Sequence, residues 1–299
     1  NMSLGMLIID ESGQAIPPSA LGALYRTKRA VVVGDPLQVE PVVTIPKVLI
    51  DILADSTGVA NEYKVIENSA QTFADNINEF SGMIGERQVG CPLVVHRRCI
   101  EPMFSISNLI SYDNRMFNKT HKKEDYLKQE QPFLIKKSGW INVEGTENGS
   151  KDHFVKNQAE RVCQLLESAL HIYTNLYETD DKIFIITPFR TVAESMRKFV
   201  IGYFSVKGYD KEMLTKWTKN CVGTVHTFQG KDANEVLFVL GCSDKSVGAM
   251  NWVVKKANIL NVACTRAKYR IAFIGNLNDW KNRRYFREFI PKFIDTIDA

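Results

Sequence analysis

The sequence has no apolar stretch long enough to cross a membrane, no internal repeat and no low-complexity tract. Because a membrane-spanning helix needs about 20 apolar residues, we expect no membrane segment. No basic and then apolar leader stands at the start of the chain, so nothing marks it for secretion. These absences favour a globular cytoplasmic protein over a membrane, fibrous or disordered one.

Cysteine is scarce and scattered. None of the six cysteines forms a C-x-x-C pair or another spacing typical of metal sites, so we expect reduced thiols in a cytosolic protein. The formal net charge of +4 permits a polyanionic partner without requiring one. Composition therefore excludes several classes of protein but leaves the activity open.

Six short apolar segments are predicted to be strands. Runs such as Leu7–Ile9 and Ala30–Val33 are apolar at every position, which is typical of strands buried on both faces. Apolar residues with helical spacing occur at 159–169 and 192–200. Strands that alternate with helices predict an α/β fold with parallel sheets. The predicted strands are Leu7–Ile9, Ala30–Val33, Lys182–Thr187, Val222–Val225, Val236–Leu240 and Arg270–Ile274.

A change of domain is predicted near residues 83–91, where glycines and a proline interrupt the pattern. We expect one domain over residues 1–88 and a second over residues 89–299. Residues 113–137 form the most polar segment and are predicted to be an exposed excursion. The helical segment 286–293 carries its apolar side chains on one face, which we expect to pack on its own domain.

Acidic residues stand where the first predicted strand ends. Asp10 and Glu11 come directly after Leu7–Ile9, and Gln38 closes the turn after Ala30–Val33. Ligands of open α/β sheets bind outside the carboxyl ends of the strands, so these side chains are candidates for a shared site. One carboxylate could hold Mg²⁺ and the other could orient or deprotonate a water, while the amide could contact a terminal phosphate. The trio suits hydrolysis of a nucleoside triphosphate.

Six segments resemble the motifs of superfamily 1 helicases, in the family's order. "IIDESGQA" and "VVVGDPLQVEPV" resemble motifs II and III, and "LVVHRRCIEPMFSISN" resembles the segment with the motif IV arginine. "IFIITPFR" resembles the strand and turn with a Thr-Pro-aromatic element, "VGTVHTFQGKDANEVLFVLG" resembles motif V, and "NILNVACTRAKYRIAFIGN" resembles motif VI. The branch that contains the nonsense-mediated decay helicase fits best. The resemblance implies a RecA-like P-loop NTPase fold, with parallel sheets and helices on both faces.

The resemblance also implies roles for individual residues. Arg98 and Arg266 would be arginine fingers that neutralise charge at the γ-phosphate, and a shift of the motif by one residue would exchange Arg98 for Arg97. Asp10 would hold Mg²⁺, while Glu11 and Gln38 would act on the attacking water and the phosphate.

Further residues are implied in binding. Gln229, Gly230 and Asp232 would bind ATP, although the family commonly has glutamate where this chain has Asp232. Thr187 and Thr224 would lie near the nucleic acid, together with His226. A strand-end cap for Thr187 and a hydrogen bond within a turn for His226 remain open as alternatives.

The phosphate-binding motif G-x-x-x-x-G-K-[ST] does not occur in the sequence, whose only Gly-Lys pair is Gly230-Lys231. In the family this loop precedes motif II, so we expect the chain to be the C-terminal part of a longer helicase and to be inactive alone. The full protein would use ATP and Mg²⁺ to move along single-stranded DNA or RNA, by resemblance 5′-to-3′. The oligomeric state is left open, with a monomer favoured. The alternative is a non-hydrolysing nucleic-acid-binding or scaffolding module with a helicase-like shell.

Overall fold

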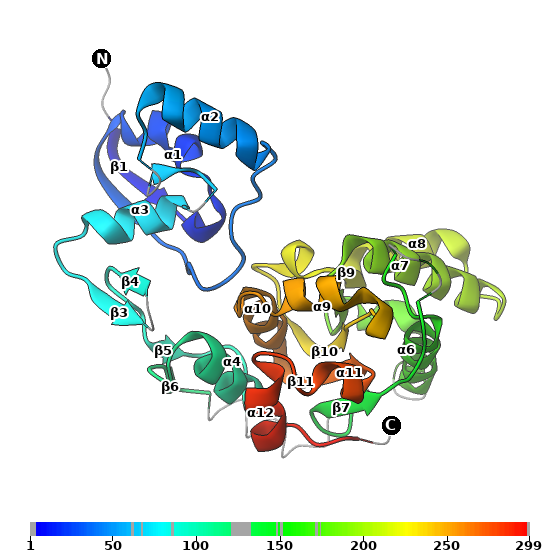
Figure 1. Cartoon of the computed structure of the whole chain (residues 1–299). Coiled ribbons are helices and arrows are strands. Elements are labelled where there is room, and N and C mark those ends of the chain that lie inside the picture. The colour runs from blue at the N-terminus through cyan, green and yellow to red at the C-terminus, as the bar shows by residue number, and fades with distance from the viewer. Residues whose placement is uncertain are drawn as a thin grey trace. The chain divides into compact units, whose positions relative to one another are not determined.

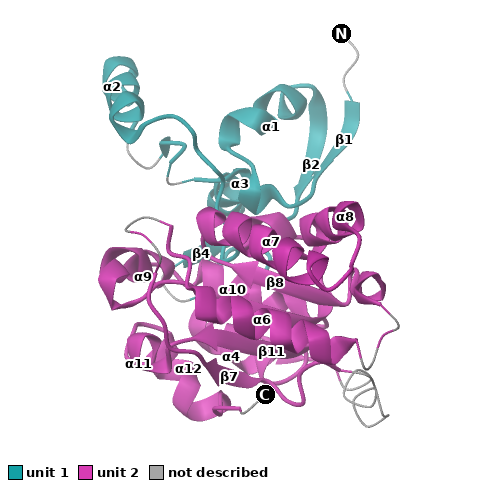
Figure 2. Cartoon of the chain, turned by 90° about the vertical axis from the view of Figure 1, so that its right-hand side faces the viewer, with its two compact units in different colours: residues 1–94 teal, residues 95–299 magenta. Residues whose placement is uncertain are grey.

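The computed structural model describes residues 4–60, 63–66, 68–84, 87–120, 133–147, 149, 152–170, 173 and 175–297. It divides the chain into two compact units, unit 1 (residues 1–94) and unit 2 (residues 95–299) (Figure 2). The boundary predicted from the sequence lies between residues 88 and 89. Most of the polar segment predicted as an excursion, residues 121–132, lies outside the described residues.

Unit 1 is built around two parallel strands, β1 (Leu4–Ile9) and β2 (Thr27–Val32), joined through helix α1 (Pro17–Leu24) (Figure 1). Pro17 stands in the first turn of α1, where its missing N–H would have no partner within the helix. Helix α3 (Ala70–Ile77) begins with a capping box in which Ser69 and Thr72 exchange hydrogen bonds. The other elements are η1 (Ser12–Gln14), α2 (Lys47–Thr57), β3 (Gly82–Ile84) and β4 (Arg87–Val89).

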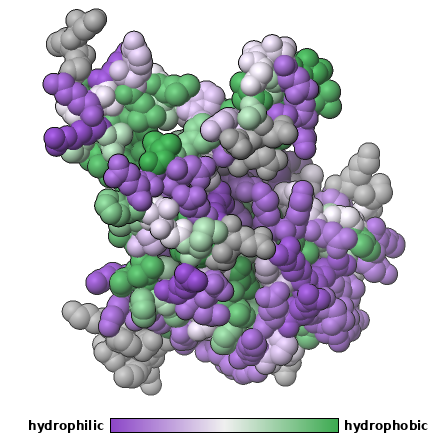
Figure 3. Space-filling view, turned by 60° about the vertical axis from the view of Figure 1, so that its left-hand side comes forward, coloured by the Kyte–Doolittle hydropathy of each residue, from purple (hydrophilic) through white to green (hydrophobic). Residues whose placement is uncertain are grey.

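The strands of unit 1 are not buried on both faces, contrary to the prediction from their apolar sequences. Leu7 and Ile9 are half-buried, whereas Met6 is 57% exposed and Ile8 is 68% exposed. Because successive side chains of a strand point to opposite faces, this alternation means that the described residues partly cover one face of the sheet and leave the other open. Hydrophobic residues accordingly gather near the top left of Figure 3.

Unit 2 contains a five-stranded parallel sheet with the strand order β7-β11-β10-β8-β9. All five residues of β8 are buried, and since their side chains alternate between faces, helices must cover both sides of the sheet. The α/β class and the parallel sheet are therefore confirmed. The strands are β7 (Gly139–Asn142), β8 (Ile183–Thr187), β9 (Val222–Thr224), β10 (Ala233–Val239) and β11 (Ala267–Gly275).

The predicted helical segments in unit 2 are helices α6 (Lys156–Ala169) and α7 (Arg190–Ser205). Helix α6 buries all the apolar residues with helical spacing, and α7 buries all but Phe199, which is half-buried. Strand β7 was not predicted, because its four residues form too short a run to stand out. The remaining elements are β5 (Val95–His96), α4 (Met103–Ser111), β6 (Phe117–Asn118), η3 (Leu176–Thr179), α8 (Lys211–Cys221), η4 (Val225–Phe228), η5 (Asp244–Ser246), α9 (Val247–Val253), α10 (Asn258–Arg266) and α11 (Leu277–Trp280).

Helix α12 (Phe286–Phe293) packs its aromatic residues on its own unit, as predicted. The ring of Phe286 lies 5.8 Å from that of Trp140, and Phe289 lies 5.5 Å from Phe273 in β11. Phe286 and Phe289 are fully buried, and Phe293, the third phenylalanine of α12, is half-buried. Among the described residues, no helix combines the length and the apolar character that crossing a membrane requires.

Candidate functional site

The turns that follow β1 and β2 lie against each other in unit 1. The two strands are parallel neighbours, and the Val33 N–H extends their pairing by donating to the Ile9 carbonyl at 2.8 Å. A Cβ on Gly13 would stand 2.7 Å from the Asp35 carbonyl oxygen, and one on Gly34 would stand 2.6 Å from the Gly13 nitrogen. Glycine is therefore required in both turns for this close approach.

Ser12 fixes the same junction from inside unit 1. Its hydroxyl lies 2.8 Å from the Val33 carbonyl and 2.7 Å from the Gln71 side-chain oxygen, and its N–H donates to Val33. The Gln71 amide in turn donates to Asp75 at 2.8 Å, and Asp75 also accepts the N–H of Gly90. Helix α3 and the loop after β4 thus support the turn that carries the acids. Sequence reasoning missed Ser12, although its place next to Glu11 could have drawn attention to it.

The predicted trio reaches one edge of this sheet. Asp10 and Glu11 are exposed, and Gln38 is half-buried with its amide donating to Asp35 at 3.0 Å. Glu11 has a left-handed backbone (φ 51°), which is uncommon for a residue with a side chain and costs about 1–3 kcal/mol. Carboxylate oxygens suit Mg²⁺, and Asp10, Glu11 and Asp35 offer them at this edge, so the residues fit the metal that the family implies.

In unit 2, residues of three predicted motifs meet around Asp232. The Arg98 guanidinium lies 3.8 Å from one Asp232 oxygen, and the Lys268 ammonium lies 2.7 Å from the other. The side chains of Arg98 and Asp232 are 38% and 34% exposed, whereas Arg97 is exposed. A predicted finger and a predicted nucleotide-binding residue thus form one ion pair. Lys268 was missed, although it stands two residues after Arg266 in the same motif.

Arg266 is fully buried within unit 2. Its guanidinium donates to the carbonyl oxygens of Phe228 at 3.3 Å and Lys231 at 2.9 Å, on either side of Gln229 and Gly230. Carbonyl dipoles of this kind stabilise a buried cation. The bend they surround depends on Gly230, whose φ of 79° favours glycine. Arg266 therefore holds the loop that carries the predicted nucleotide-binding residues.

The three predicted nucleic-acid residues lie at or just beyond the carboxyl ends of β8 and β9. Thr187 and Thr224 are direct partners across the two strands. The Thr187 side chain is buried and its hydroxyl accepts the Phe189 N–H at 3.4 Å, so the strand-end cap that the sequence left open is present. Thr224 caps the turn η4. His226 is an exposed residue whose ring is partly desolvated, which lowers its pKa.

Two parts of the chain match known protein families. Residues 80–278 match a family described as an AAA domain, and residues 1–45 match a second family with the same description. The first match alone covers more than half of the chain. The chain belongs to the AAA domain family.

Relatives of this AAA domain chain are helicases. The uncharacterized ATP-dependent helicase MJ0104 of Methanocaldococcus jannaschii is 24% identical over 95% of this chain and 38% of its own length. The probable helicase senataxin of Mus musculus is 23% identical over 95% of the chain and 10% of its length. The ATP-dependent helicase NAM7 of Saccharomyces cerevisiae is 23% identical over 90% of the chain and 25% of its length.

The resemblance to superfamily 1 helicases is thereby confirmed, in the branch of NAM7 and senataxin. The chain spans less than half the length of the three relatives named above. A solved structure of an arterivirus nonstructural protein 10 (helicase) with DNA has a TM-score of 0.43 and 12% identity, over 97% of this chain and 43% of that chain.

Proposed function

We propose that the chain is part of an ATP-dependent helicase that couples nucleoside triphosphate hydrolysis to movement along single-stranded DNA or RNA. The contact between the turns after β1 and β2 carries this proposal, because it places Asp10 and Glu11 beside the turn of Gln38. The family match and the helicase relatives support the same activity. The protein acts in the cytoplasm, where reduced thiols such as its six free cysteines persist, and of the possible oligomeric states we favour a monomer.

The two motor domains predicted from the sequence have separate parts in this function. Residues 1–88 belong to a first RecA-like motor domain, which supplies the acids and Gln38. Residues 89–299 form the second motor domain, which supplies Arg98, Arg266 and the nucleotide-binding loop. Most residues of the unit 2 sheet are buried, which supports an independently folded second domain.

Each of the three candidate residues of unit 1, Asp10, Glu11 and Gln38, then has a role in hydrolysis. Asp10 holds the Mg²⁺ that accompanies the nucleotide and neutralises phosphate charge when bound. Glu11 orients the attacking water and accepts its proton, since its carboxylate is exposed at the end of β1, where it accepts a hydrogen bond from the Gln14 amide at 3.1 Å. Gln38 contacts the terminal phosphate through an amide that Asp35 now orients.

The arginines act from unit 2. Arg98 reaches the phosphate by leaving Asp232, and at 3.8 Å between half-exposed groups that ion pair is weak. Asp232, together with Gln229 and Gly230, binds the nucleotide. Arg266 acts as a finger only when the loop from Phe228 to Lys231 releases its guanidinium.

Nucleic acid binds across the carboxyl ends of β8 and β9. Thr224 and His226 are accessible there, and Thr187 becomes a phosphate contact if its hydroxyl turns away from Phe189. Single-stranded DNA and RNA remain equal candidates, because the contacts proposed are to the backbone.

The phosphate loop is the part of the machinery that these residues do not supply. Without the backbone N–H groups and the lysine of this loop, the acids lack the groups that hold the β- and γ-phosphates in P-loop proteins. We therefore propose that the 299 residues alone do not hydrolyse ATP.

The test is the substitution Glu11→Gln in the helicase extended to include its phosphate loop. The amide keeps the shape of the side chain and removes the base, so we expect turnover to fall by about 10²–10⁴-fold while Mg·ATP affinity is retained. Steady-state ATPase assays and nucleotide titrations measure the two quantities. Glu79→Gln, at another exposed glutamate of unit 1, is the control and should keep full turnover.

Wild-type turnover in the Glu11→Gln protein would refute the role of Glu11. An extended wild-type protein that binds single strands without hydrolysing ATP would instead favour the scaffolding alternative. Turnover by the 299 residues alone, abolished by Glu11→Gln, would show that the site is complete without a phosphate loop.

A further inference from the structure

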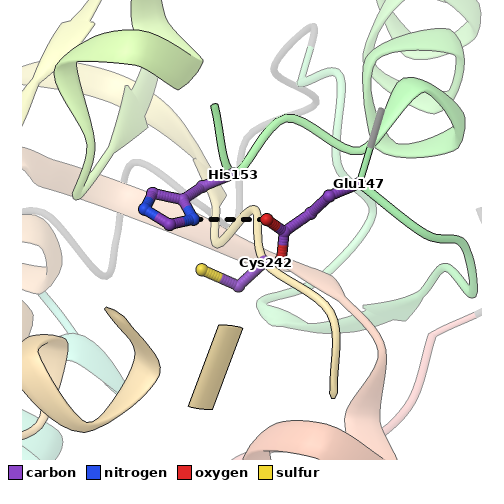
Figure 4. Close-up of side chains that lie close together, drawn as sticks. All are labelled: Glu147, His153 and Cys242. Carbon is purple, nitrogen blue, oxygen red and sulfur yellow. Dashed lines mark hydrogen bonds and ion pairs between the residues drawn. The ribbon is translucent and has the colours of Figure 1, made fainter. Parts of the chain in front are cut away.

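Three side chains of unit 2 with metal-binding groups converge at one place that no motif of the helicase family explains. Glu147 follows β7, His153 precedes α6, and Cys242 follows β10. One ligand atom from each, a carboxylate oxygen, a ring nitrogen and the sulfur, lie within 4.8 Å of one another (Figure 4). Within the described parts of the chain, this is the one such group.

We propose that Glu147, His153 and Cys242 bind a Zn²⁺ ion. Zinc takes thiolate, imidazole and carboxylate ligands at about 2.0–2.3 Å in a tetrahedral arrangement, which places ligand atoms roughly 3.3–3.7 Å apart. The His153 Nδ1 and the Glu147 Oε2 are already 3.2 Å apart. The Cys242 sulfur lies within 4.8 Å of the other two ligand atoms, so it has to approach them by at most about 1.3 Å. A water molecule completes the coordination.

Neighbouring groups orient the Glu147 carboxylate through hydrogen bonds, as residues around zinc ligands commonly do. The Ser243 N–H donates to Glu147 Oε1 at 2.7 Å, and the Ser246 hydroxyl donates to Oε2 at 2.8 Å. The side chain of Glu147 is 1% exposed, while that of His153 is 21% exposed. The site is thus enclosed on the side of the glutamate and open toward the imidazole.

The backbone is also shaped around the three residues. His153 and Cys242 both have left-handed conformations, with φ of 55° and 58°, and each costs about 1–3 kcal/mol for a residue that is not glycine. The Cys242 N–H donates to the His153 carbonyl at 2.9 Å, and a Cβ on Gly241 would stand 2.6 Å from that oxygen. The two residues that would supply the nitrogen and sulfur ligands, His153 and Cys242, are therefore both strained and are joined by a backbone hydrogen bond.

The ion would join two segments at the carboxyl edge of the unit 2 sheet. His153 also packs on Phe189, with 4.9 Å between ring centroids, and Phe189 lies two residues after Thr187. A metal at this place has a structural role, because it would fix the loops beside the end of β8. It is independent of ATP hydrolysis, so its test and that of the proposed function can fail separately.

The experiment uses the untagged 299-residue chain, first stripped of metal by a chelator and then titrated with Zn²⁺ and Co²⁺. We expect one Zn²⁺ per chain, a rise in the unfolding temperature on addition of Zn²⁺, and a Co²⁺ spectrum with a thiolate charge-transfer band. The spectrum of the wild-type chain is decisive even if a variant fails to fold. No stoichiometric binding, or a Co²⁺ spectrum without the thiolate band, would overturn the proposal and leave only a hydrogen-bonded cluster.

Matched variants identify the ligands. Cys242→Ser should abolish the thiolate band and weaken Zn²⁺ binding at least 100-fold, while Cys163→Ser, at a buried cysteine of α6, should bind like the wild type. His153→Asn should weaken binding by about 10–100-fold or more, since asparagine tolerates the left-handed backbone but offers no imidazole. Unchanged affinity in Cys242→Ser, or an equal loss in Cys163→Ser, would refute the site.

Discussion

The strands of the two units have similar sequences and opposite surroundings. Ile8 and Ile9 in β1 resemble Ile185 and Ile186 in β8, yet Ile8 is 68% exposed while both residues of β8 are 0% exposed. Strand β8 lies inside a five-stranded sheet, whereas β1 pairs only with β2 among the described residues. An apolar strand is therefore buried only where the chain also supplies neighbouring strands and covering helices.

The charged residues of the candidate sites in the two units also differ in how far they are buried. In unit 1 the acids are exposed at the end of an open sheet, and their position depends on a contact between two turns. In unit 2 the charged groups Arg266, Glu235 and Glu147 are buried and hydrogen-bonded. Mutations should therefore affect stability mainly in unit 2 and local geometry in unit 1.

The largest difference is expected between Trp140→Ala in unit 2 and Ile8→Ala in unit 1. Trp140 is 1% exposed, stacks on Phe273 and donates its indole N–H to Gly275 at 2.9 Å. Its truncation should cost unit 2 about 3–5 kcal/mol, whereas Ile8→Ala should change stability by about 0.5 kcal/mol or less. Urea unfolding by tryptophan fluorescence measures unit 2, since all four tryptophans lie there, and hydrogen exchange measures unit 1.

A large loss of protection in unit 1 for Ile8→Ala would contradict the comparison, because it would mean that the open face is covered in solution. A loss below about 1 kcal/mol for Trp140→Ala would mean that the core of unit 2 is loosely packed.

The second-largest expected effect is a change in the stability of unit 2 with pH. Glu235 in β10 is 1% exposed, and its oxygens accept the N–H groups of Leu134 and Ile135, both at 2.7 Å. Burial raises its pKa from 4.5 to about 7, against the opposing effects of these hydrogen bonds and Arg270. The folded state therefore binds a proton more tightly than the unfolded state does. This stabilisation is complete below pH 4.5 and is lost as the pH rises through 7.

The free energy of unfolding of unit 2 should thus fall by on the order of 3 kcal/mol between pH 4.5 and pH 8, because Glu235 loses its proton over this range. Glu235→Gln should remove this slope. Because the amide replaces one of the two accepting oxygens with an NH2 donor, one of the two N–H groups loses its acceptor, and stability should fall by about 1–3 kcal/mol at the acid end. Urea unfolding at several pH values measures both effects, with Glu212→Gln at an exposed position as the control. Parallel pH profiles for the wild type and Glu235→Gln would refute the assignment.

The smallest effect concerns the turns of unit 1. Gly13→Ala should cost about 1–3 kcal/mol by overpacking, since its Cβ would stand 2.7 Å from the Asp35 carbonyl oxygen, and it should move Glu11 away from the turn of Gln38. Gly22→Ala in α1 has no atom within 4 Å of the new Cβ and should stabilise the helix by up to about 1 kcal/mol. Hydrogen exchange of residues 4–40 measures both. Equal hydrogen-exchange protection of residues 4–40 in the two variants would show that the turns do not meet in solution.

Local sequence determined the features that depend on neighbours in the chain. The periods of apolar residues fixed helices α6 and α7, and the apolar runs fixed most strands of the parallel sheet in unit 2. The position of Asp10 and Glu11 at a strand end also follows from sequence, because a turn begins where the apolar run stops. The ordered motifs were enough to indicate the helicase family.

Tertiary structure alone decided which distant residues meet and which are covered. Nothing in the sequence separates the open sheet of unit 1 from the covered sheet of unit 2, because burial depends on what packs against a strand rather than on the strand itself. The enclosure of Arg266 by the Phe228 and Lys231 carbonyls is equally invisible in the motif. Glu147 and His153 lie in one connection between β7 and α6, whereas Cys242 follows β10 much later in the chain. Their spacing matches no metal motif, because the fold of the sheet edge brings Cys242 to the other two.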